Sequence, residues 1–304
     1  TITIAARKDL GTDTYSMYRF TFGVGWENLT APTRATTSGG RDVLKLRHTT
    51  FNFGDGNRII FVDGVNPAMV WDGANWFEIE SDNTGASSAS PGGNQALDAP
   101  ALVQVFKNHI FLSGDDDFKS VVANSAPNAW FDFTVANGAA QNFAGFNVVQ
   151  IKPFRESLFV FGETAINKMV PDTEAGFLVQ GVTTNVGCVA RDSVVEIGGD
   201  LAFLAPDGVR PVAGTSNIGD VELETVSKSV QLLMSSLPTN YDLTKLNSVV
   251  IRGKSQLRYF VSDGDTSTGS AFGVLGAIRI TDENTAWEFS ELVGIRASVC
   301  ESGY

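Results

Sequence analysis

Apolar residues along this chain gather into short bursts of four or five, each preceded by a polar residue and closed by glycine. Short apolar runs bounded by Gly, Asp and Asn are typical of buried strands rather than helices. Five bursts share this form: "RIIFVDG" at 58–64, "NHIFLSG" at 108–114, "ESLFVFG" at 156–162, "DLAFLAPDG" at 200–208 and "QLRYFVSDG" at 256–264.

The bursts recur at nearly regular intervals. Their anchor positions are 51, 48, 43 and 56 residues apart when they are taken as Ile59, Ile110, Leu158, Leu201 and Leu257. A period of about 50 residues is typical of repeat architectures, and kelch-like propeller blades have this length. The pattern therefore indicates an internally repeated, strand-based fold.

Other strand signals recur more loosely around each anchor. A strand is predicted before the anchor at 101–107, 147–153, 192–198 and 247–253, and a Trp-bearing strand after it at 76–79, 130–133 and 287–290. Asp-Gly pairs at 63–64, 72–73, 207–208 and 263–264 suit the primed turns that hairpins prefer. The repeating unit is thus predicted to hold about four short strands, with the anchor strand near the middle of its sheet.

A four-stranded sheet leaves its edges and faces exposed, and radial stacking of such sheets covers them. We predict an all-β chain, a β-propeller with five to six short four-stranded blades and few helices. The propeller spans 46–304 with blades anchored near 59, 110, 158, 201 and 257, and the N-terminal segment 1–45 supplies a ring-closing strand or a partial blade.

Three segments depart from the strand pattern. Residues 222–237 show helical spacing, with Val226, Val230 and Leu233 on one face, and predict a helix between the fourth and fifth blades. The polar segments 30–40 and 81–100 are rich in Gly, Ser and Pro and predict loops. We expect the loop at 81–100 and the helix to contact neighbouring subunits or fibres.

Composition narrows the range of functions. The formal charge is −12, so the surface repels nucleic acid and suits a channel past which DNA slides without sticking. The sequence contains no run of about 18 apolar residues, so we predict no membrane span. It also shows no signal-peptide pattern at its start. Because the chain begins at Thr1 rather than Met, we expect a processed protein or a fragment.

Few residues could carry metal or cofactor chemistry. His109 lies inside an anchor strand and is expected to pack there, and His48 is the other histidine. Cys188 and Cys300 are expected to be free and mostly buried, with a disulfide left open. The run Asp115–Asp117 supplies oxygen ligands for Ca²⁺, but it lacks the glycine and glutamate of an EF-hand loop and also fits a solvated turn. No zinc spacing, phosphate-binding loop or nucleophile elbow is present.

Carboxylates and tryptophans recur with the repeat. Glycoside hydrolysis needs two acids across one pocket, and the candidates Asp72, Asp132, Asp207 and Glu288 fall at turns or outer strands, so no pair is nominated and no enzyme is predicted. The tryptophans could stack on sugars, but their repetition at matching places favours packing between blades; they are Trp71, Trp76, Trp130 and Trp287. No catalytic, cofactor-binding or metal-ligating residue is assigned.

Three phrases resemble one family. They are "FVDGVNPAMVWDGANWFEI" at 61–79, "LVQVFKNHIFLSG" at 102–114 with "VVANSAPNAWFDF" at 121–133, and "VVQIKPFRESLFVFGETAINKMV" at 148–170 with "VGCVARDSVVEIGGDLAFLAPDGVRPV" at 186–212. Together they resemble the propeller proteins of tailed-phage virions: the nozzle protein, also called tail tubular protein B, and the tail hub or packaged-DNA stabilisation protein. The similarity covers about 58–300.

The resemblance implies a structural component of the phage tail in the virion. It implies a ring of subunits, usually six, that lies below the portal and its adaptor, continues the DNA channel, helps retain and release the genome, and docks fibres or a tail tip. Double-stranded DNA would pass without sequence-specific binding, and no catalytic residue or cofactor is implied. The alternative is a carbohydrate-binding or glycan-degrading β-propeller, which would need two facing carboxylates and an exposed tryptophan in one cleft.

Overall fold

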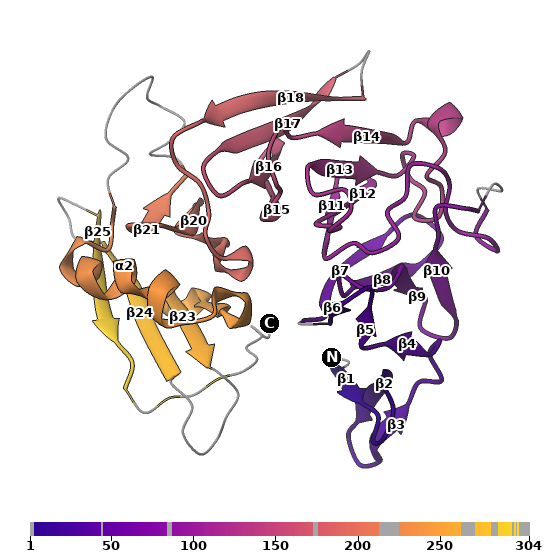
Figure 1. The fold of residues 1–304 in the computed structure, drawn as a ribbon, viewed down its shortest axis with the longest axis horizontal. Helices are drawn as coiled ribbons and strands as arrows, with labels where there is room; N and C mark the ends of the chain where they lie inside the picture. Colours follow the sequence, from indigo (N-terminus) through magenta and orange to yellow (C-terminus); the bar gives the residue numbers. More distant parts are fainter. Residues whose placement is uncertain are drawn as a thin grey trace. The chain divides into compact units, whose positions relative to one another are not determined.

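The computed structural model describes residues 3–43, 45–83, 87–172, 176–212, 225–262, 271–280, 285–293, 295 and 297. The regular structure in these residues is mostly antiparallel sheet, drawn in chain order in Figure 1. The chain divides into two compact units: unit 1 is Thr1–Ile151 with Pro171–Phe177, and unit 2 is Lys152–Val170 with Leu178–Tyr304. The boundary between the units runs through the fourth sheet.

Six sheets of three or four strands follow one another in the described part of the chain. The first contains β1 (Thr3–Lys8), β2 (Thr14–Thr21), β3 (Gly25–Asn28) and β4 (Arg34–Ala35), and a two-stranded sheet of β5 (Thr37–Ser38) and β6 (Arg41–Asp42) follows it. The second contains β7 (Arg47–Asn52), β8 (Asn57–Val62), β9 (Ala68–Trp71) and β10 (Trp76–Ile79); the third contains β11 (Leu102–Phe106), β12 (His109–Ser113), β13 (Val121–Asn124) and β14 (Ala140–Phe143). The fourth contains β15 (Gln150–Phe154), β16 (Ser157–Phe161), β17 (Ile166–Asp172) and β18 (Gly176–Thr183); the fifth contains β19 (Val195–Ile197), β20 (Asp200–Ala205) and β21 (Gly208–Pro211). The sixth contains β22 (Asn247–Ile251), β23 (Gln256–Ser262), β24 (Ala271–Ile280) and β25 (Thr285–Glu291).

Each anchor burst forms the second strand of its sheet. The anchors lie on β8, β12, β16, β20 and β23, and each of these strands has a hydrogen-bonded neighbour on both sides. Because an inner strand is covered by its neighbours as well as by the packing on its faces, it needs the most apolar sequence; Ile110, Leu158, Leu201 and Leu257 are fully buried. The fold class predicted from the sequence, an all-β chain of repeated propeller-type blades, is confirmed.

The first sheet packs on the second through a small core of its own. β2 pairs with β1 on one side and with β3 and β4 on the other. The alternate residues Tyr15 and Met17 of β2 are buried in a cluster with Phe61, Met69 and Trp71 of the second sheet. Residues on one face of β2 therefore hold the N-terminal sheet in place, and the residues between them point to its other face.

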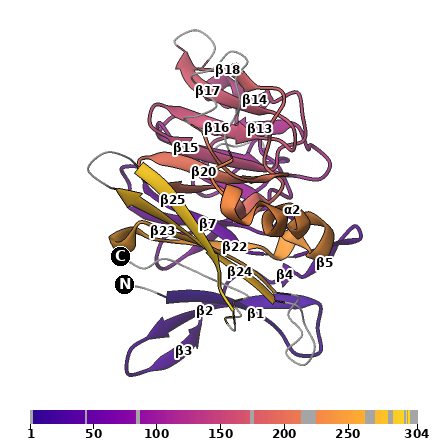
Figure 2. The same cartoon turned by 90° about the vertical axis from the view of Figure 1, so that its left-hand side faces the viewer.

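The predicted helix lies between the fourth and fifth anchors, but it begins later than expected. A 3₁₀ turn covers Lys228–Val230 and α2 covers Gln231–Asn240, while 222–224 lie outside the described residues. Met234 and Leu237 of α2 are buried in the core of unit 2, and Val226, Val230 and Leu233 pack against that core. The views in Figures 1 and 2 place α2 beside the strands of the sixth sheet.

The prediction of an outer strand at 130–133 is wrong. The outer strand of the third sheet is β14, and the segment Trp130–Phe133 instead lies beside Pro91–Gly93 through backbone hydrogen bonds. Parallel bridges join Glu80 to Gly92 and Gly92 to Asp132, so this segment extends the outer side of the second sheet. The Trp130 side chain is buried in the core that the second and third sheets share.

The loop at 81–100 is not a free excursion. Residues 87–90 are exposed, but 91–93, Ala96 and Leu97 are buried, and the last two belong to the core of the second and third sheets. Gly92 and Gly93 are required here because the backbone of other segments lies against them: a Cβ on Gly92 would lie 1.9 Å from the Glu80 carbonyl oxygen. The second half of the loop is therefore part of the fold.

Candidate functional site

The recurring carboxylates make their hydrogen bonds inside their own turns. Asp72 accepts from the backbone N–H groups of Ala74 and Asn75 at 2.8 and 2.6 Å, and these bonds lower its pKa although desolvation opposes the shift. Asp132 accepts from the Thr134 N–H at 2.9 Å and from the Asn137 amide at 2.6 Å. Both side chains close turns, which is an ordinary structural use of Asp.

The other two candidate carboxylates lie in unit 2. Asp207 accepts from Arg210 Nε at 2.9 Å and from the Thr225 hydroxyl at 2.7 Å, and these partners lower its pKa against the opposing effect of burial. Glu288 pairs with Arg279 at 3.1 Å on the exposed surface of β24 and β25. Neither contact brings a second carboxylate toward the first, as glycoside hydrolysis requires.

The acidic run at 115–117 also serves the fold. Asp115 is buried and accepts from the Ala99 N–H at 3.0 Å and from the Asp117 N–H at 2.9 Å. Arg41 pairs with Asp117 at 3.2 Å. Among the described residues, no group of three or more His, Cys, Asp or Glu is placed to hold a metal ion. Asp115 therefore acts as a turn residue that joins the end of the 81–100 segment to the third sheet.

The histidine and cysteine predictions can be compared with the structure. His109 is half-buried on β12, where Nδ1 lies 2.6 Å from the Ser125 carbonyl oxygen and desolvation lowers its pKa. His48 is exposed on β7. The Cys188 thiol is free and buried, and desolvation raises its pKa to about 11. Cys300 lies outside the described residues.

Most of the recurring tryptophans pack between sheets, as predicted. Trp71 and Trp76 stack with ring centroids 5.8 Å apart, and the Trp76 indole donates to the Leu29 carbonyl of the first sheet at 3.1 Å. Trp130 packs against Phe77 at 5.2 Å. Trp287 stacks on Phe289 at the surface of the unit 2 core.

A buried polar network, which the sequence pattern did not indicate, fixes the N-terminal sheet. The Tyr15 hydroxyl donates to Asp63 Oδ2 at 2.6 Å, and Asp63 Oδ1 accepts from the backbone N–H groups of Val65 and Asn66 at 2.8 Å each. Burial and the Asp63 charge raise the pKa of Tyr15 well above its ordinary value. Arg34, also buried, donates to Glu78 and to the Pro67 carbonyl.

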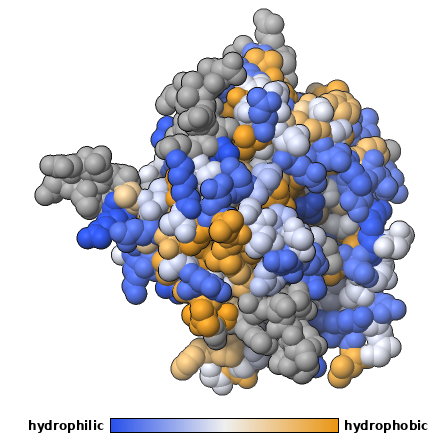
Figure 3. All heavy atoms as spheres, turned by 60° about the vertical axis from the view of Figure 1, so that its left-hand side comes forward, coloured by the Kyte–Doolittle hydropathy of each residue, from blue (hydrophilic) through white to orange (hydrophobic). Residues whose placement is uncertain are grey.

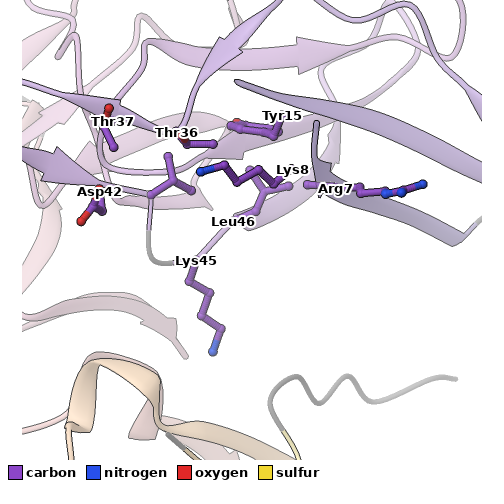
Figure 4. A pocket seen from close by; sticks show the side chains of 10 residues that line it. Arg7, Lys8, Tyr15, Thr36, Thr37, Asp42, Lys45 and Leu46 are labelled. Carbon is purple, nitrogen blue, oxygen red and sulfur yellow. The ribbon is translucent and has the colours of Figure 1, made fainter. Parts of the chain in front are cut away.

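A cavity of about 380 Å³ opens beside this network in the N-terminal segment. Its lining combines the apolar surface of Tyr15, Val43 and Leu46 with the hydroxyls of Thr36 and Thr37 and with Arg7, Lys8, Lys45 and Asp42. In Figure 4 the charged ends of Arg7 and Lys45 extend outward, and Lys8 lies beside Tyr15 and Leu46. Asp42 is the one carboxylate among the described lining residues, so this cavity does not supply the acid pair of a glycosidase.

Among the described residues, the largest concentration of exposed apolar side chains lies on the hairpin of β2 and β3. Four of them fall within seven residues, and their exposed fractions are 40% for Phe20, 95% for Phe22, 69% for Val24 and 54% for Trp26. We call residues 20–26 the aromatic hairpin. Figure 2 shows β2 and β3 extending as a two-stranded projection within the N-terminal sheet. Exposed apolar side chains gathered in this way make the aromatic hairpin a candidate interaction surface.

Side chains make cross-strand contacts on both faces of the hairpin. Phe20 and Trp26 are directly paired across the strands, with ring centroids 5.4 Å apart, and they share one face of the sheet. On the other face Glu27 accepts from Arg19 at 3.3 Å and from the Thr21 hydroxyl at 2.9 Å. The aromatic side chains are therefore presented on a defined backbone.

Charge is distributed unevenly along the chain. Residues 1–50 hold seven Lys or Arg against four Asp or Glu, a net charge of +3, whereas residues 51–304 hold fifteen against thirty, a net charge of −15.

The surface is also mixed in hydropathy. Figure 3 shows hydrophobic residues reaching the surface in separate groups among hydrophilic ones. Within the described residues, none of the helices has the length and hydrophobicity needed to span a membrane.

Comparisons with known proteins give no family. No family model matches the chain, and no curated protein matches it. Among solved structures, the chain is similar to the extracellular domain of a putative hybrid two-component system from B. thetaiotaomicron, with 8% identity, a TM-score of 0.41, and coverage of 92% of this chain and 33% of that one. It is also similar to Raptor from Chaetomium thermophilum (9% identity, TM-score 0.41, 94% of this chain and 27% of that one). A third similar structure is Hsv2 from Kluyveromyces lactis (10% identity, TM-score 0.36, 92% of both chains). The chain thus spans about a third or less of the first and second of these proteins, and we assign no function from the three.

Proposed function

We propose that this protein is a structural, non-catalytic propeller component of a bacteriophage tail, of the nozzle or hub type. Copies of the chain assemble into a ring around the DNA channel, and its recurring aspartates and tryptophans serve turns and packing.

The observation that carries the proposal is that the recurring aspartates and tryptophans make their contacts within the fold. Asp72, Asp132 and Asp207 close turns, and Trp71, Trp76 and Trp130 pack between sheets. Residues of the kinds that would serve a glycan site are therefore committed to holding the blades. The aromatic hairpin, in contrast, leaves four apolar side chains exposed, and such a surface is suited to assembly with another protein chain.

The phrases that resemble phage propeller proteins support the proposal independently. The first phrase, 61–79, runs from within β8 to the end of β10, and the second, 102–114 with 121–133, covers β11 to β13. The third, 148–170 with 186–212, covers β15, β16, most of β17 and β19 to β21. The phrases therefore fall mainly on the strands of the second to fifth sheets. The net charge of −12 fits a channel protein, because an acidic wall repels the phosphate backbone of passing DNA.

The proposal is tested by the assembly state and by location. Native mass spectrometry and cryo-EM class averages of the purified chain are expected to show a closed ring, with six copies as the resemblance implies. Mass spectrometry of purified virions is expected to detect the chain. A monomer at every concentration, together with absence from virions, would refute the proposal.

The glycan-binding alternative has its own readout. An array of polysaccharides and oligosaccharides is expected to show no binding by the chain, and retention of one sugar class would favour the alternative. Because Trp26 is the exposed tryptophan of the aromatic hairpin, Trp26→Ala tests whether any such binding uses this surface.

A further inference from the structure

We propose that the aromatic hairpin is the contact by which one copy of this chain binds the acidic body of the next, an inference that rests on the ring proposed above. The hairpin carries four exposed apolar side chains, and leaving such a surface in water forgoes about 25 cal/mol for each Å² that a partner would cover. Aromatic side chains on a rigid backbone are the usual anchors of protein interfaces.

The charge pattern indicates that the partner covering the aromatic hairpin is a second copy of this chain. The hairpin belongs to the N-terminal segment of net charge +3, and Arg7, on the same face as Tyr18, Phe20 and Trp26 by the strand pairing, is exposed. Residues 51–304 carry a net charge of −15 and would be repelled by an anionic bilayer or by nucleic acid. The same charge attracts the N-terminal segment 1–50 of another copy, which carries the net charge of +3.

Unit 1 also offers a matching acceptor. Phe118 and Phe143 are 52% and 67% exposed. They lie at the same end of the third sheet, because Val121 pairs with Phe143 and the Val121 N–H donates to the Phe118 carbonyl. Asp116, two residues before Phe118, is exposed, and the exposed Asp117 beside it pairs with Arg41 at 3.2 Å. This apolar pair with an acidic edge complements an apolar hairpin with a basic edge.

A contact between two different surfaces has a consequence for symmetry. Each copy has one hairpin and one acceptor, so the contact is heterologous and can be repeated from copy to copy. Such contacts generate a ring when the rotation closes and a filament when it does not. The inferred contact thus supplies the geometry that a tail ring needs.

The first experiment measures association of the full chain by sedimentation velocity across a range of concentrations. Phe22→Ser combined with Trp26→Ser is expected to weaken association by about 30-fold or more, the effect of losing a hot spot. Leu232→Ser is the matched control, because Leu232 on α2 is 89% exposed but lies outside both surfaces. Circular dichroism and a urea midpoint check that each variant is folded, and Arg7→Glu, which leaves the aromatic side chains in place, is expected to weaken association and to reduce its dependence on salt.

The second experiment identifies the surfaces by disulfide trapping in a Cys300→Ser background. Mixing Phe22→Cys protein with Phe143→Cys protein is expected to give disulfide-linked pairs, and either protein alone is expected to give few. Dimers from Phe22→Cys alone would show a hairpin-to-hairpin contact and overturn the heterologous inference.

The outcomes separate this inference from the proposed function. Unchanged assembly of the Phe22→Ser/Trp26→Ser variant would refute the hairpin contact while leaving the ring intact. A wild-type chain that stays monomeric at every concentration would refute the hairpin contact, and together with absence from virions it would also refute the proposed function. Co-sedimentation of the wild-type chain with vesicles of anionic phospholipid, lost in the hairpin variant, would assign the hairpin to a membrane instead of a second copy.

Discussion

Replacing Gly92 with alanine tests whether the second and third sheets are joined through the backbone of the 81–100 segment. Gly92 has φ of 143°, and a Cβ there would lie 1.9 Å from the Glu80 carbonyl oxygen. No ordinary Cβ contact is shorter than 3.0 Å, so the two segments must move apart by about 1 Å.

The expected loss of stability has two parts. An L-residue at this φ costs about 1–3 kcal/mol in backbone strain. The displacement also breaks or lengthens the buried bonds from Gly93 N to Glu80 O (3.1 Å), from Gly92 N to Phe131 O (2.8 Å) and from Phe133 N to Gly92 O (2.9 Å). At about 1 kcal/mol each these bonds contribute about 3 kcal/mol, so the total loss is about 4–6 kcal/mol.

The assay is urea unfolding followed by tryptophan fluorescence, with Gly73→Ala as the control. Gly73 has φ of 102° and no atom within 4 Å of the added Cβ, so alanine there meets backbone strain alone, about 1–3 kcal/mol. The free energy of unfolding is expected to fall by about 3 kcal/mol more for Gly92→Ala than for Gly73→Ala. Equal losses in the two variants would refute the close-approach argument.

Three further predictions concern buried groups. Tyr15→Phe removes the 2.6 Å bond to the Asp63 carboxylate and is expected to lower the free energy of unfolding by about 1.5–3 kcal/mol in the same urea assay; no change would show that the bond does not stabilise the N-terminal sheet. Trp130→Ala, at a fully buried side chain, is expected to cost about 3–5 kcal/mol, whereas Trp26→Ala changes the stability of the isolated chain by less than about 0.5 kcal/mol, and comparable losses would contradict the assigned burial. Stability is expected to fall by about 2 kcal/mol as the pH rises from 9 to 11, because over this range the Cys188 thiol, whose pKa burial raises to about 11, ionises mainly in the unfolded chain; Cys188→Ala should remove this part of the alkaline loss, and an unchanged pH profile would refute it.

The repeat could be predicted from the sequence because each blade is specified locally. The anchor bursts are apolar for a reason that applies to every inner strand, so their spacing located five sheets and placed α2 between the last two. The polar residues that close turns, such as Asp72, also act on their immediate neighbours. Pattern reasoning succeeds where structure is decided within a few residues.

The failures involve contacts between distant segments. Trp130–Phe133 has the composition of an outer strand, but its backbone bonds to Gly92 and its indole fills a core shared by two sheets. The segment 81–100 looks solvated by composition, yet the Gly92–Gly93 pair followed by Ala96 and Leu97 is the signal of a close backbone approach and a buried turn. The exposed aromatic side chains of the hairpin could not be predicted, since alternating aromatic residues in a strand normally indicate a buried face.

The contiguous order of the strands has a consequence for biosynthesis. From the second sheet onward, each sheet is built from one uninterrupted stretch of chain, such as 47–79 or 102–143. At translation rates of about 5–20 residues per second, a stretch of this kind leaves the ribosome within several seconds, and its hydrogen-bond ladder can close before the following stretch is synthesised. The bonds between Pro91–Gly93 and Trp130–Phe133 must wait for the later stretch, so the nascent second sheet exposes its outer edge until the third arrives.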